Sequence, residues 1–271
     1  MSDSHAKFDG SIPENYDRIL GPFLFEHYAK DIAARLPSGD ATRILETACG
    51  TGIATQYARE ALGPDATIVA TDLNPPMLDV ANAKRGFLPG VTFQEANAQA
   101  LPFSDNEFDA VLCQFGMMFL PDKPLGMAEA LRVLKPGGTF AFNVWDDFEA
   151  NPAMVTAHET VGRFFDEEPP QFFTVPFGWN DKAVIGGMLS DAGFENIEME
   201  DIDHLGYAET AAELAFGCIN ANPTLHEVQE RATASPEAVV AALATELNDR
   251  FGEDPLRIPM RAIVITATKP G

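Results

Sequence analysis

Residues 43–55 read RILETACGTGIAT, an apolar run that ends at Glu46 and passes directly into a turn containing Gly50 and Gly52. Glycine accepts left-handed backbone angles and lets another molecule approach the main chain closely. In an open α/β sheet, ligands bind at the carboxyl ends of the strands. The stretch therefore predicts a ligand site, and the acid indicates an occupant that carries a hydroxyl group or a positive charge.

Around this stretch, β-type segments alternate with amphipathic segments, which is typical of βαβ units and a parallel sheet covered on both faces. Asn74 is the expected N-cap of the second helix after the turn, and Pro136-Gly137-Gly138 is expected to turn the chain into the fifth strand. Strands are expected at 43–48, 66–71, 91–95, 108–113, 139–145, 194–202 and 262–267, and helices at 23–36, 53–62, 75–84, 123–134 and 181–192.

The alternation of predicted strands and helices is interrupted twice. Residues 147–180 are rich in aromatic side chains and prolines without a strand period, and residues 207–251 have a helical pattern. We interpret both as insertions into one sheet domain, residues 41–271, and not as a second independent domain. Residues 1–40 are expected to form an N-terminal helical lid, and the chain contains no internal repeat.

The composition limits the partners of the protein. The 271 residues are 46% hydrophobic and carry a formal net charge of −23. Such an acidic surface repels phosphate backbones and anionic lipid headgroups, which argues against nucleic-acid and membrane partners. The N-terminal residues MSDSHAKFDG do not resemble a signal peptide, and no apolar run reaches membrane-spanning length.

Three cysteines, Cys49, Cys113 and Cys218, cannot all pair with one another, and their spacing contains no CxxC metal pattern. Cysteines on apolar segments usually act as small core residues. We therefore expect a reduced, cytoplasmic protein without a metal site.

A second acid defines the class of ligand. Asp72 ends the second expected strand, 20 residues after Gly52, where an acid can accept hydrogen bonds from a ribose. A dinucleotide fingerprint would place glycine or alanine at position 55, where this chain has Thr55, and Glu46 is a poor neighbour for a pyrophosphate. Glu46 is a better neighbour for an amino group. A ligand with a ribose at one end and an ammonium group at the other fits, and S-adenosylmethionine is such a ligand.

Four consecutive motifs carry a resemblance to a known family. They are ETACGTG, TDLNPPML, NAQALPFSDNEFDAVLCQFGMMFLPD and ALRVLKPGGTFAFNVW, and they cover roughly residues 40–145. In this order they resemble the class I S-adenosylmethionine-dependent methyltransferases that act on small molecules, of the methyltransferase type 11 or ubiquinone-menaquinone type. The resemblance implies a Rossmann-like fold with a mostly parallel seven-stranded sheet, helices on both faces and helical cover insertions.

The resemblance also implies which residues hold the cofactor. The residues that match the family's methionine-binding loop, ribose acid, adenine pocket and methionine-facing strand end are Glu46, Ala48, Gly50, Gly52, Asp72, Leu73, Met77, Asn97, Ala98, Gln114 and Phe115. Two of them depart from the pattern. Ala48 replaces a glycine and is expected to keep ordinary backbone angles. Asn97 replaces an aspartate, and its amide oxygen can still accept from the adenine amine.

Several of these residues also allow a purely structural role. Glu46 could be a strand-end acid that satisfies local amides, Asp72 could cap the next helix, and Met77 could belong to the core. Tyr16 is the candidate for a lid residue over the methionine end, and it could equally be a packed tyrosine. No catalytic base is identified, because a lone histidine such as His158 is more often structural.

The leading hypothesis is an enzyme that moves a methyl group from S-adenosylmethionine to a small-molecule acceptor. The phenylalanines of 147–180 suggest an apolar or aromatic acceptor, although they could as easily form the core of a helical cover. The first alternative is an NAD-dependent oxidoreductase on a Rossmann-type fold. The second is a non-catalytic S-adenosylmethionine-binding protein, because the motifs report binding and not turnover. The sequence does not define the accepting atom or the oligomeric state.

Overall fold

The computed structural model describes residues 9–37, 39 and 42–271. Residues 1–8, 38 and 40 of the expected N-terminal lid, and residue 41 of the expected sheet domain, lie outside the described residues. The chain forms two compact units. Unit 1 contains residues 1–26, 146–178 and 203–261, and unit 2 contains residues 27–145, 179–202 and 262–271.

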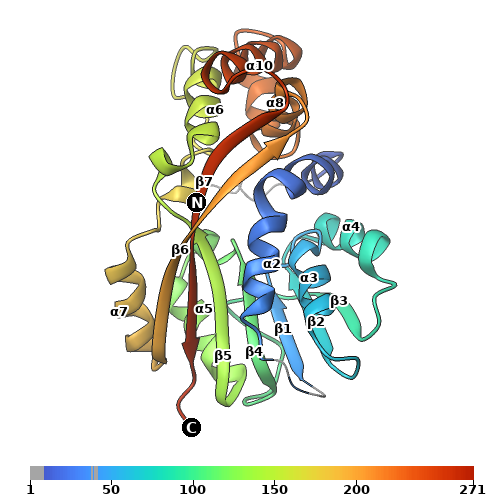
Figure 1. Cartoon of the computed structure of the whole chain (residues 1–271), viewed down its shortest axis with the longest axis vertical. Helices are drawn as coiled ribbons and strands as arrows, with labels where there is room; N and C mark the ends of the chain where they lie inside the picture. Colours follow the sequence, from blue (N-terminus) through green and yellow to red (C-terminus); the bar gives the residue numbers. More distant parts are fainter. Residues whose placement is uncertain (1–8, 38, 40–41) are drawn as a thin grey trace. The chain divides into compact units, whose positions relative to one another are not determined.

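A seven-stranded sheet has the order β3-β2-β1-β4-β5-β7-β6 (Figure 1). Strands β3, β2, β1, β4 and β5 pair in parallel, and β7 pairs antiparallel with β5. This mostly parallel sheet confirms the predicted fold class. The strands are β1 Arg43–Thr47, β2 Thr67–Asp72, β3 Val91–Glu95, β4 Phe108–Gln114, β5 Leu134–Trp145, β6 Glu195–Ala208 and β7 Leu256–Thr268.

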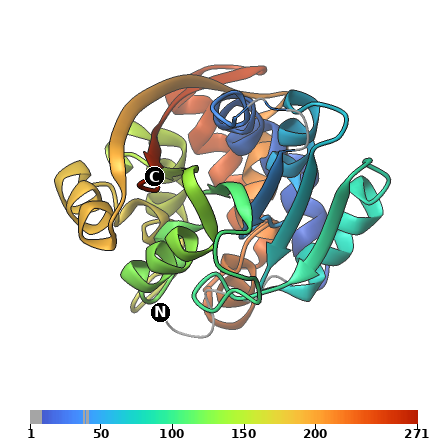
Figure 2. The same cartoon turned by 90° about the horizontal axis from the view of Figure 1, so that it is seen from below.

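Helices flank the sheet of unit 2 on both sides (Figure 2). They are α2 Glu26–Ala34, α3 Ile53–Ala61, α4 Pro75–Arg85, α5 Lys123–Val133 and α7 Lys182–Ala192, with the short 3₁₀ helix η3 Met117–Phe119 after β4. The predicted helices at 53–62, 75–84, 123–134 and 181–192 are confirmed to within one residue at each end.

The first strand lies at the centre of this sheet. Strand β1 pairs with β2 on one side and with β4 on the other, and its Ile44 and Leu45 are fully buried. The chain therefore leaves β1 toward one side of the sheet and returns to the other side of β1. Such a reversal is where open α/β sheets bind their ligands.

Unit 1 is largely helical and contains most of the residues of the two predicted insertions. Helix α10 packs against both α6 and α8. The elements of this unit are α1 Ile12–Asn15, the π-helix η2 Tyr16–Phe25, η4 Phe148–Ala150, α6 Pro152–Gly162, η5 Val175–Phe177, α8 Ala211–Asn220, α9 Thr224–Arg231, α10 Pro236–Phe251 and the outer ends of β6 and β7.

Four predicted boundaries were wrong. The helix expected to start at Phe23 is preceded by helical residues from Ile12 onward, because Pro22 is accommodated within a π-helix. Strands β6 and β7 extend well beyond 194–202 and 262–267. Gly137, with φ +75°, lies inside β5 and not in a turn before it, and the pairing of β5 with β4 shifts register there.

Within the described residues, no helix is both long enough and apolar enough to span a membrane.

Candidate functional site

Glu46 is almost completely buried at the end of β1, with only 1% of its surface exposed. The hydroxyl group of Thr55 donates a hydrogen bond of 2.5 Å to Glu46 Oε2, and the hydroxyl group of Thr71 donates one of 2.9 Å to the Glu46 carbonyl oxygen. The other carboxylate oxygen, Oε1, is buried and has no hydrogen-bond donor among the described residues. A buried acceptor without a donor is costly in a folded protein, so Oε1 is a candidate contact for a ligand.

The environment of Glu46 raises its pKa from 4.5 to about 8. The main cause is removal of the carboxylate from water, and the negative charge of Asp72 acts in the same direction. The hydrogen bond from Thr55 and the positive charge of Arg85 favour the ionised form and partly offset the effect. A cationic ligand at Oε1 would supply the missing positive partner and return the pKa toward its ordinary value.

The turn after β1 adopts left-handed backbone angles at three residues, with φ +53° at Ala48, +55° at Gly50 and +85° at Gly52. The expectation of ordinary angles at Ala48 was wrong. A Cβ built on Gly116 would lie only 2.5 Å from the Ala48 Cβ, so the glycine at position 116 leaves room for the Ala48 methyl group. At Gly50, the nearest atom to such a Cβ would be Met77 Cε at 3.9 Å, so this glycine borders open space.

Asp72 joins the end of β2 to the same turn. Its Oδ2 accepts a 2.8 Å hydrogen bond from the Gly50 backbone N–H, and its Oδ1 accepts a 2.8 Å hydrogen bond from the Asn74 backbone N–H. Asn74 occupies the predicted N-cap position of α4 but makes no side-chain cap hydrogen bond. Burial raises the pKa of Asp72. Hydrogen bonds from Asn74, Gly50 and Leu73 lower this pKa and partly offset the effect of burial.

The flank of the predicted adenine pocket contains one exposed and one buried apolar side chain. Leu73 is 59% exposed although it directly follows Asp72, whereas Met77 on α4 is 5% exposed. Asn97 is exposed, and its Oδ1 accepts a 2.9 Å hydrogen bond from the Gln99 backbone N–H. Ala98, the next residue in the chain, is half-buried. The backbone bond to Gln99 fixes the orientation of the Asn97 amide in a local turn.

An aromatic cluster forms at the end of β4. Phe115 has φ +51°, and its ring stacks on Trp145 with 4.0 Å between centroids. Tyr28 meets both rings edge-on, at 5.6 Å from Phe115 and 5.4 Å from Trp145. The Phe115 backbone N–H donates to Asn143 Oδ1 at 2.9 Å, which holds the unusual backbone angle in place. Gln114, immediately before it, is half-buried.

Tyr16 belongs to unit 1, where it begins the π-helix η2. Its ring stacks on Phe25 with 4.8 Å between centroids. This contact agrees with the packed-tyrosine alternative, and contact of Tyr16 with a ligand stays a prediction.

Sequence reasoning missed several residues around the turn. Thr55 was noted only because it replaces a glycine, although it donates to Glu46. Arg85 donates from Nη1 to the Thr51 carbonyl oxygen at 2.9 Å and so ties α4 to the turn. Their partners lie 9 and 34 residues away in sequence. The only available signal was the polar character of position 55 at the start of an apolar helix.

The cysteines are buried, and none forms a disulfide. Burial raises the pKa of Cys113 to about 11 and that of Cys218 to about 12, so both remain protonated thiols near neutral pH. Burial also raises the pKa of Cys49. Thiols of this kind are poor nucleophiles, which agrees with their predicted role as core residues.

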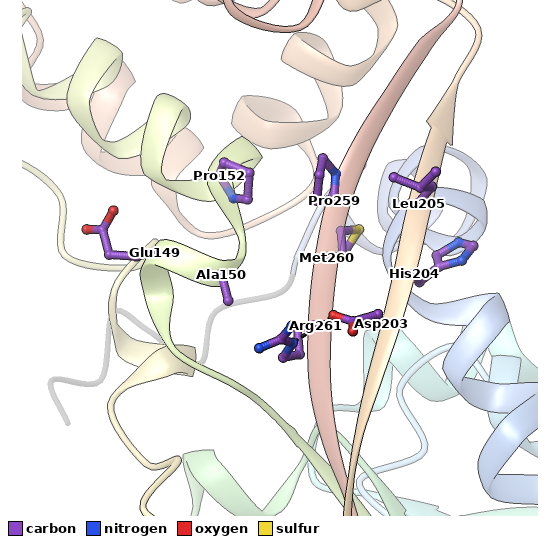
Figure 3. Close-up of a pocket in the computed structure, with 9 residues that line it drawn as sticks. All are labelled: Glu149, Ala150, Pro152, Asp203, His204, Leu205, Pro259, Met260 and Arg261. Carbon is purple, nitrogen blue, oxygen red and sulfur yellow. Dashed lines mark hydrogen bonds and ion pairs between the residues drawn. The ribbon is translucent and has the colours of Figure 1, made fainter.

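Unit 1 contains a hollow of about 570 Å³. Its walls are the outer ends of β6 and β7 and the start of α6 (Figure 3). Arg261 Nε donates to Asp203 Oδ1 at 2.7 Å along one wall. The lining residues are Glu149, Ala150, Pro152, Asp203, His204, Leu205, Pro259, Met260 and Arg261. The hollow therefore combines apolar side chains with both signs of charge.

Comparison with known proteins agrees with this geometry. A family model described as a methyltransferase domain matches residues 45–142, which include Glu46, Asp72 and Phe115. A demethylmenaquinone methyltransferase of Staphylococcus carnosus is 26% identical over 219 residues, 73% of this chain and 90% of that protein. The chain belongs to the class I S-adenosylmethionine-dependent methyltransferases.

Further proteins are similar to this chain in sequence or in fold. An uncharacterized protein of Mycobacterium tuberculosis is 42% identical over 176 residues, which is 64% of this chain and 58% of that protein. A putative methyltransferase of Haloferax volcanii, solved with its activator, has a TM-score of 0.59 at 22% identity, covering 97% of this chain and 95% of that one. A phosphoethanolamine N-methyltransferase of Haemonchus contortus has a TM-score of 0.63 at 16% identity and covers 100% of this chain and 61% of that one. These structural matches show a shared fold.

Proposed function

We propose that the turn after β1 and the end of β2 bind S-adenosylmethionine, and that the enzyme transfers the methyl group to a small-molecule acceptor. The observation that carries the proposal is the buried, unpaired Oε1 of Glu46 beside a turn with three left-handed residues. An ammonium group at Oε1 satisfies the orphaned acceptor and stabilises the ionised carboxylate. A pyrophosphate at the same place would meet a second negative charge, which disfavours the NAD-dependent alternative.

Asp72 is proposed to bind the ribose diol. Its two oxygens each hold one backbone N–H, and these bonds fix the carboxylate at the carboxyl ends of β1 and β2. The exposed Leu73 and the buried Met77 are proposed to flank the adenine, with Asn97 and Ala98 at its amino edge. Gly50 borders open space and is proposed to lie against the methionine portion, with Ala48 and Gly52 shaping the loop.

The methyl end of the cofactor is proposed to face Gln114 and Phe115 at the end of β4. When bound, S-adenosylmethionine supplies an electrophilic methyl group on a sulfonium centre. The protein then has to exclude water and align the acceptor behind that group. The rigid stack of Phe115 on Trp145, with Tyr28 against both rings, provides an apolar wall for this purpose. Tyr16, in the proposed lid of residues 1–40, is proposed to cover the methionine end.

The acceptor is proposed to be apolar or aromatic. The similarity to a demethylmenaquinone methyltransferase supports an aromatic ring system. The formal net charge of −23 supports an enzyme without nucleic-acid or membrane partners. The free, buried cysteines support a cytoplasmic location. Part of the phenylalanine content of residues 147–180 is core, since Phe173 and Phe177 are 3% and 7% exposed, so we base the acceptor class on the relative and not on those residues.

The decisive experiment measures S-adenosylhomocysteine formation with a panel of naphthoquinol, phenol, amine and carboxylate acceptors. Turnover with an aromatic hydroxyl acceptor or a quinol ring is the expected result. Binding of S-adenosylmethionine without turnover on any acceptor would instead favour a non-catalytic cofactor-binding protein. Stabilisation by NAD alone in a thermal-shift titration would contradict the cofactor assignment.

A variant pair tests the ribose contact. Asp72→Ala removes the proposed diol acceptor and is expected to weaken S-adenosylhomocysteine binding about 100-fold in calorimetry. Because it also leaves the N–H groups of Gly50 and Asn74 without their acceptor, the free protein should melt at a lower temperature. The exposed acid Asp79 on α4 is the control, and Asp79→Ala should leave the affinity unchanged. Retained affinity in Asp72→Ala would exclude the ribose role.

A further inference from the structure

Thr55 stands at a position where its hydroxyl group determines how Glu46 is presented. It lies in the first turn of α3, is fully buried, and donates a 2.5 Å hydrogen bond to Glu46 Oε2. The Thr71 hydroxyl binds the carbonyl oxygen of the same residue. The carboxylate is therefore held at one oxygen by α3, while Oε1 has no donor among the described residues.

We propose that Thr55 is a positioning residue for the cofactor: its hydroxyl group holds Glu46 Oε2 so that Oε1 faces the ammonium group of the methionine portion. The inference rests on the proposed binding of S-adenosylmethionine and assigns a new residue to that site. Threonine at this position has two effects. It fixes the rotamer of the acid, and it stabilises the anion that an ammonium group requires.

The charges around Glu46 determine its protonation, and the protonation of Glu46 can be followed through the pH dependence of ligand affinity. The charges of Asp72 on β2 and Arg85 on α4 shift the pKa of Glu46. The charge of Glu46 in turn raises the pKa of Cys49 in the turn and of Cys113 on β4. Cys49 and Cys113 have raised pKa values and are neutral thiols. Replacing Thr55 leaves Asp72 and Arg85 in place. The change in the protonation of Glu46 is then due to the lost hydrogen bond.

Affinity for the cofactor should follow the ionisation of Glu46. Below its pKa of about 8, binding of the ammonium group requires the carboxyl group to lose a proton, so affinity should rise with pH between 6 and 8. Above that range the cofactor's own amino group begins to lose its proton and affinity falls again. Loss of the Thr55 hydroxyl removes a stabiliser of the anion and shifts the rising limb to higher pH.

The test compares Thr55→Val with the wild type by calorimetry over pH 6–9, using two ligands. S-adenosylhomocysteine carries the ammonium group, whereas 5′-methylthioadenosine keeps the adenosine and the sulfur and has no amino-acid portion. We expect Thr55→Val to weaken S-adenosylhomocysteine about tenfold at pH 7 and to shift the rising limb upward by about one pH unit. Affinity for 5′-methylthioadenosine should change less than about twofold at any pH, within the scatter of mutational effects at independent sites.

Thr55→Ser, which keeps the hydroxyl donor, should restore both the affinity and the pH profile. If valine prevents folding, Thr55→Ala with Thr55→Ser gives the same comparison. Equal weakening of both ligands, or an unchanged pH profile, would overturn the role of Thr55. Failure of the wild type to bind S-adenosylhomocysteine at any pH would instead overturn the proposed cofactor site, so the two failures are distinguishable.

Discussion

At the scale of single residues, burial of the Glu46 carboxylate at the end of β1 lowers the free energy of unfolding of the protein at high pH. In the folded state the pKa of Glu46 is about 8, above its ordinary value of 4.5. A raised carboxyl pKa means that its contribution to stability is fully present below pH 4.5 and is lost as the pH rises through 8. The neutral amide of Glu46→Gln does not undergo this loss.

We therefore predict that Glu46→Gln raises the melting temperature of the ligand-free protein at pH 8.5 by about 2–8 °C, measured by calorimetry. The difference should shrink at pH 5, where the wild-type carboxyl group is protonated. The same variant should lose affinity for S-adenosylhomocysteine. A lower melting temperature than the wild type at pH 8.5 would contradict the assigned protonation.

Ala48 is a second residue expected to lower the stability of the folded protein, because alanine at φ +53° is strained relative to glycine. Ala48→Gly relieves this strain but increases the freedom of the unfolded chain. We expect the free energy of unfolding in urea titrations to stay the same or to rise by up to about 1 kcal/mol, so that the variant is at least as stable as the wild type. Ala83→Gly, at an exposed position within α4, is the control and should destabilise by about 1 kcal/mol. Similar losses at both positions would contradict the strain argument.

The sequence singled out the acids and the glycines of the candidate site because their chemistry follows from residue type alone. It did not predict the conformation of Ala48, since that depends on the absence of a side chain at Gly116, 68 positions later in the sequence. It also did not predict the contribution of Thr55, because a comparison with the dinucleotide pattern registers only that a glycine is missing. The conformation of Ala48 and the hydrogen bond of Thr55 both depend on contacts with residues distant in sequence, and not on residue type.

At the scale of elements, the connection between α3 and β2 depends on a buried cation. The Arg59 side chain is 8% exposed and donates to the carbonyl oxygens of Leu62, Gly63 and Ala66. These bonds satisfy acceptors at the end of α3 and in the turn after it.

We predict that Arg59→Gln lowers the free energy of unfolding by about 2–4 kcal/mol in urea titrations, since several buried carbonyl groups lose a charged donor. Lys182→Gln is the control. It breaks the exposed ion pair with Asp201 and should change stability by less than about 1 kcal/mol. Equal effects of the two substitutions would show that the buried position of Arg59 is not important.

Helices and parallel strands were predictable where amphipathic periods and turn residues coincide, as at 53–62 and 75–84. The lengths of β6 and β7 were not. In β7 the alternation of buried and exposed residues continues through Pro259, but a proline argues against a strand when only the sequence is considered. The π-helix around Pro22 was also missed, because a proline usually marks the end of a helix and here the extra residue per turn accommodates it.

At the scale of the whole molecule, the net charge of −23 sets a general repulsion between surface carboxylates. Salt screens such repulsion over about 10 Å at 0.1 M ionic strength. We predict that raising NaCl from about 20 to 200 mM increases the melting temperature at pH 8, measured by differential scanning fluorimetry. The increase should be smaller at pH 5, where the net charge is lower. A salt-independent melting temperature would contradict a significant role for this repulsion.

The sequence indicated one sheet domain with insertions, whereas contacts within the chain define two compact units. The assignment of residues to units was not visible in the sequence, because β6 and β7 each contribute to both. Periodicity identifies a strand, but it does not show which hydrophobic core each end of that strand joins.

The division of β6 and β7 has a practical meaning for engineering. The chain changes unit after residues 26, 145, 178, 202 and 261. Neither half can be expressed as a continuous stretch of gene, and no single fusion point would let the helical half of another enzyme replace this one. A chimaera would need three exchanged pieces joined at five places, two of them inside hydrogen-bonded strands. Selectivity in this enzyme is therefore more accessible through point substitutions than through recombination of modules.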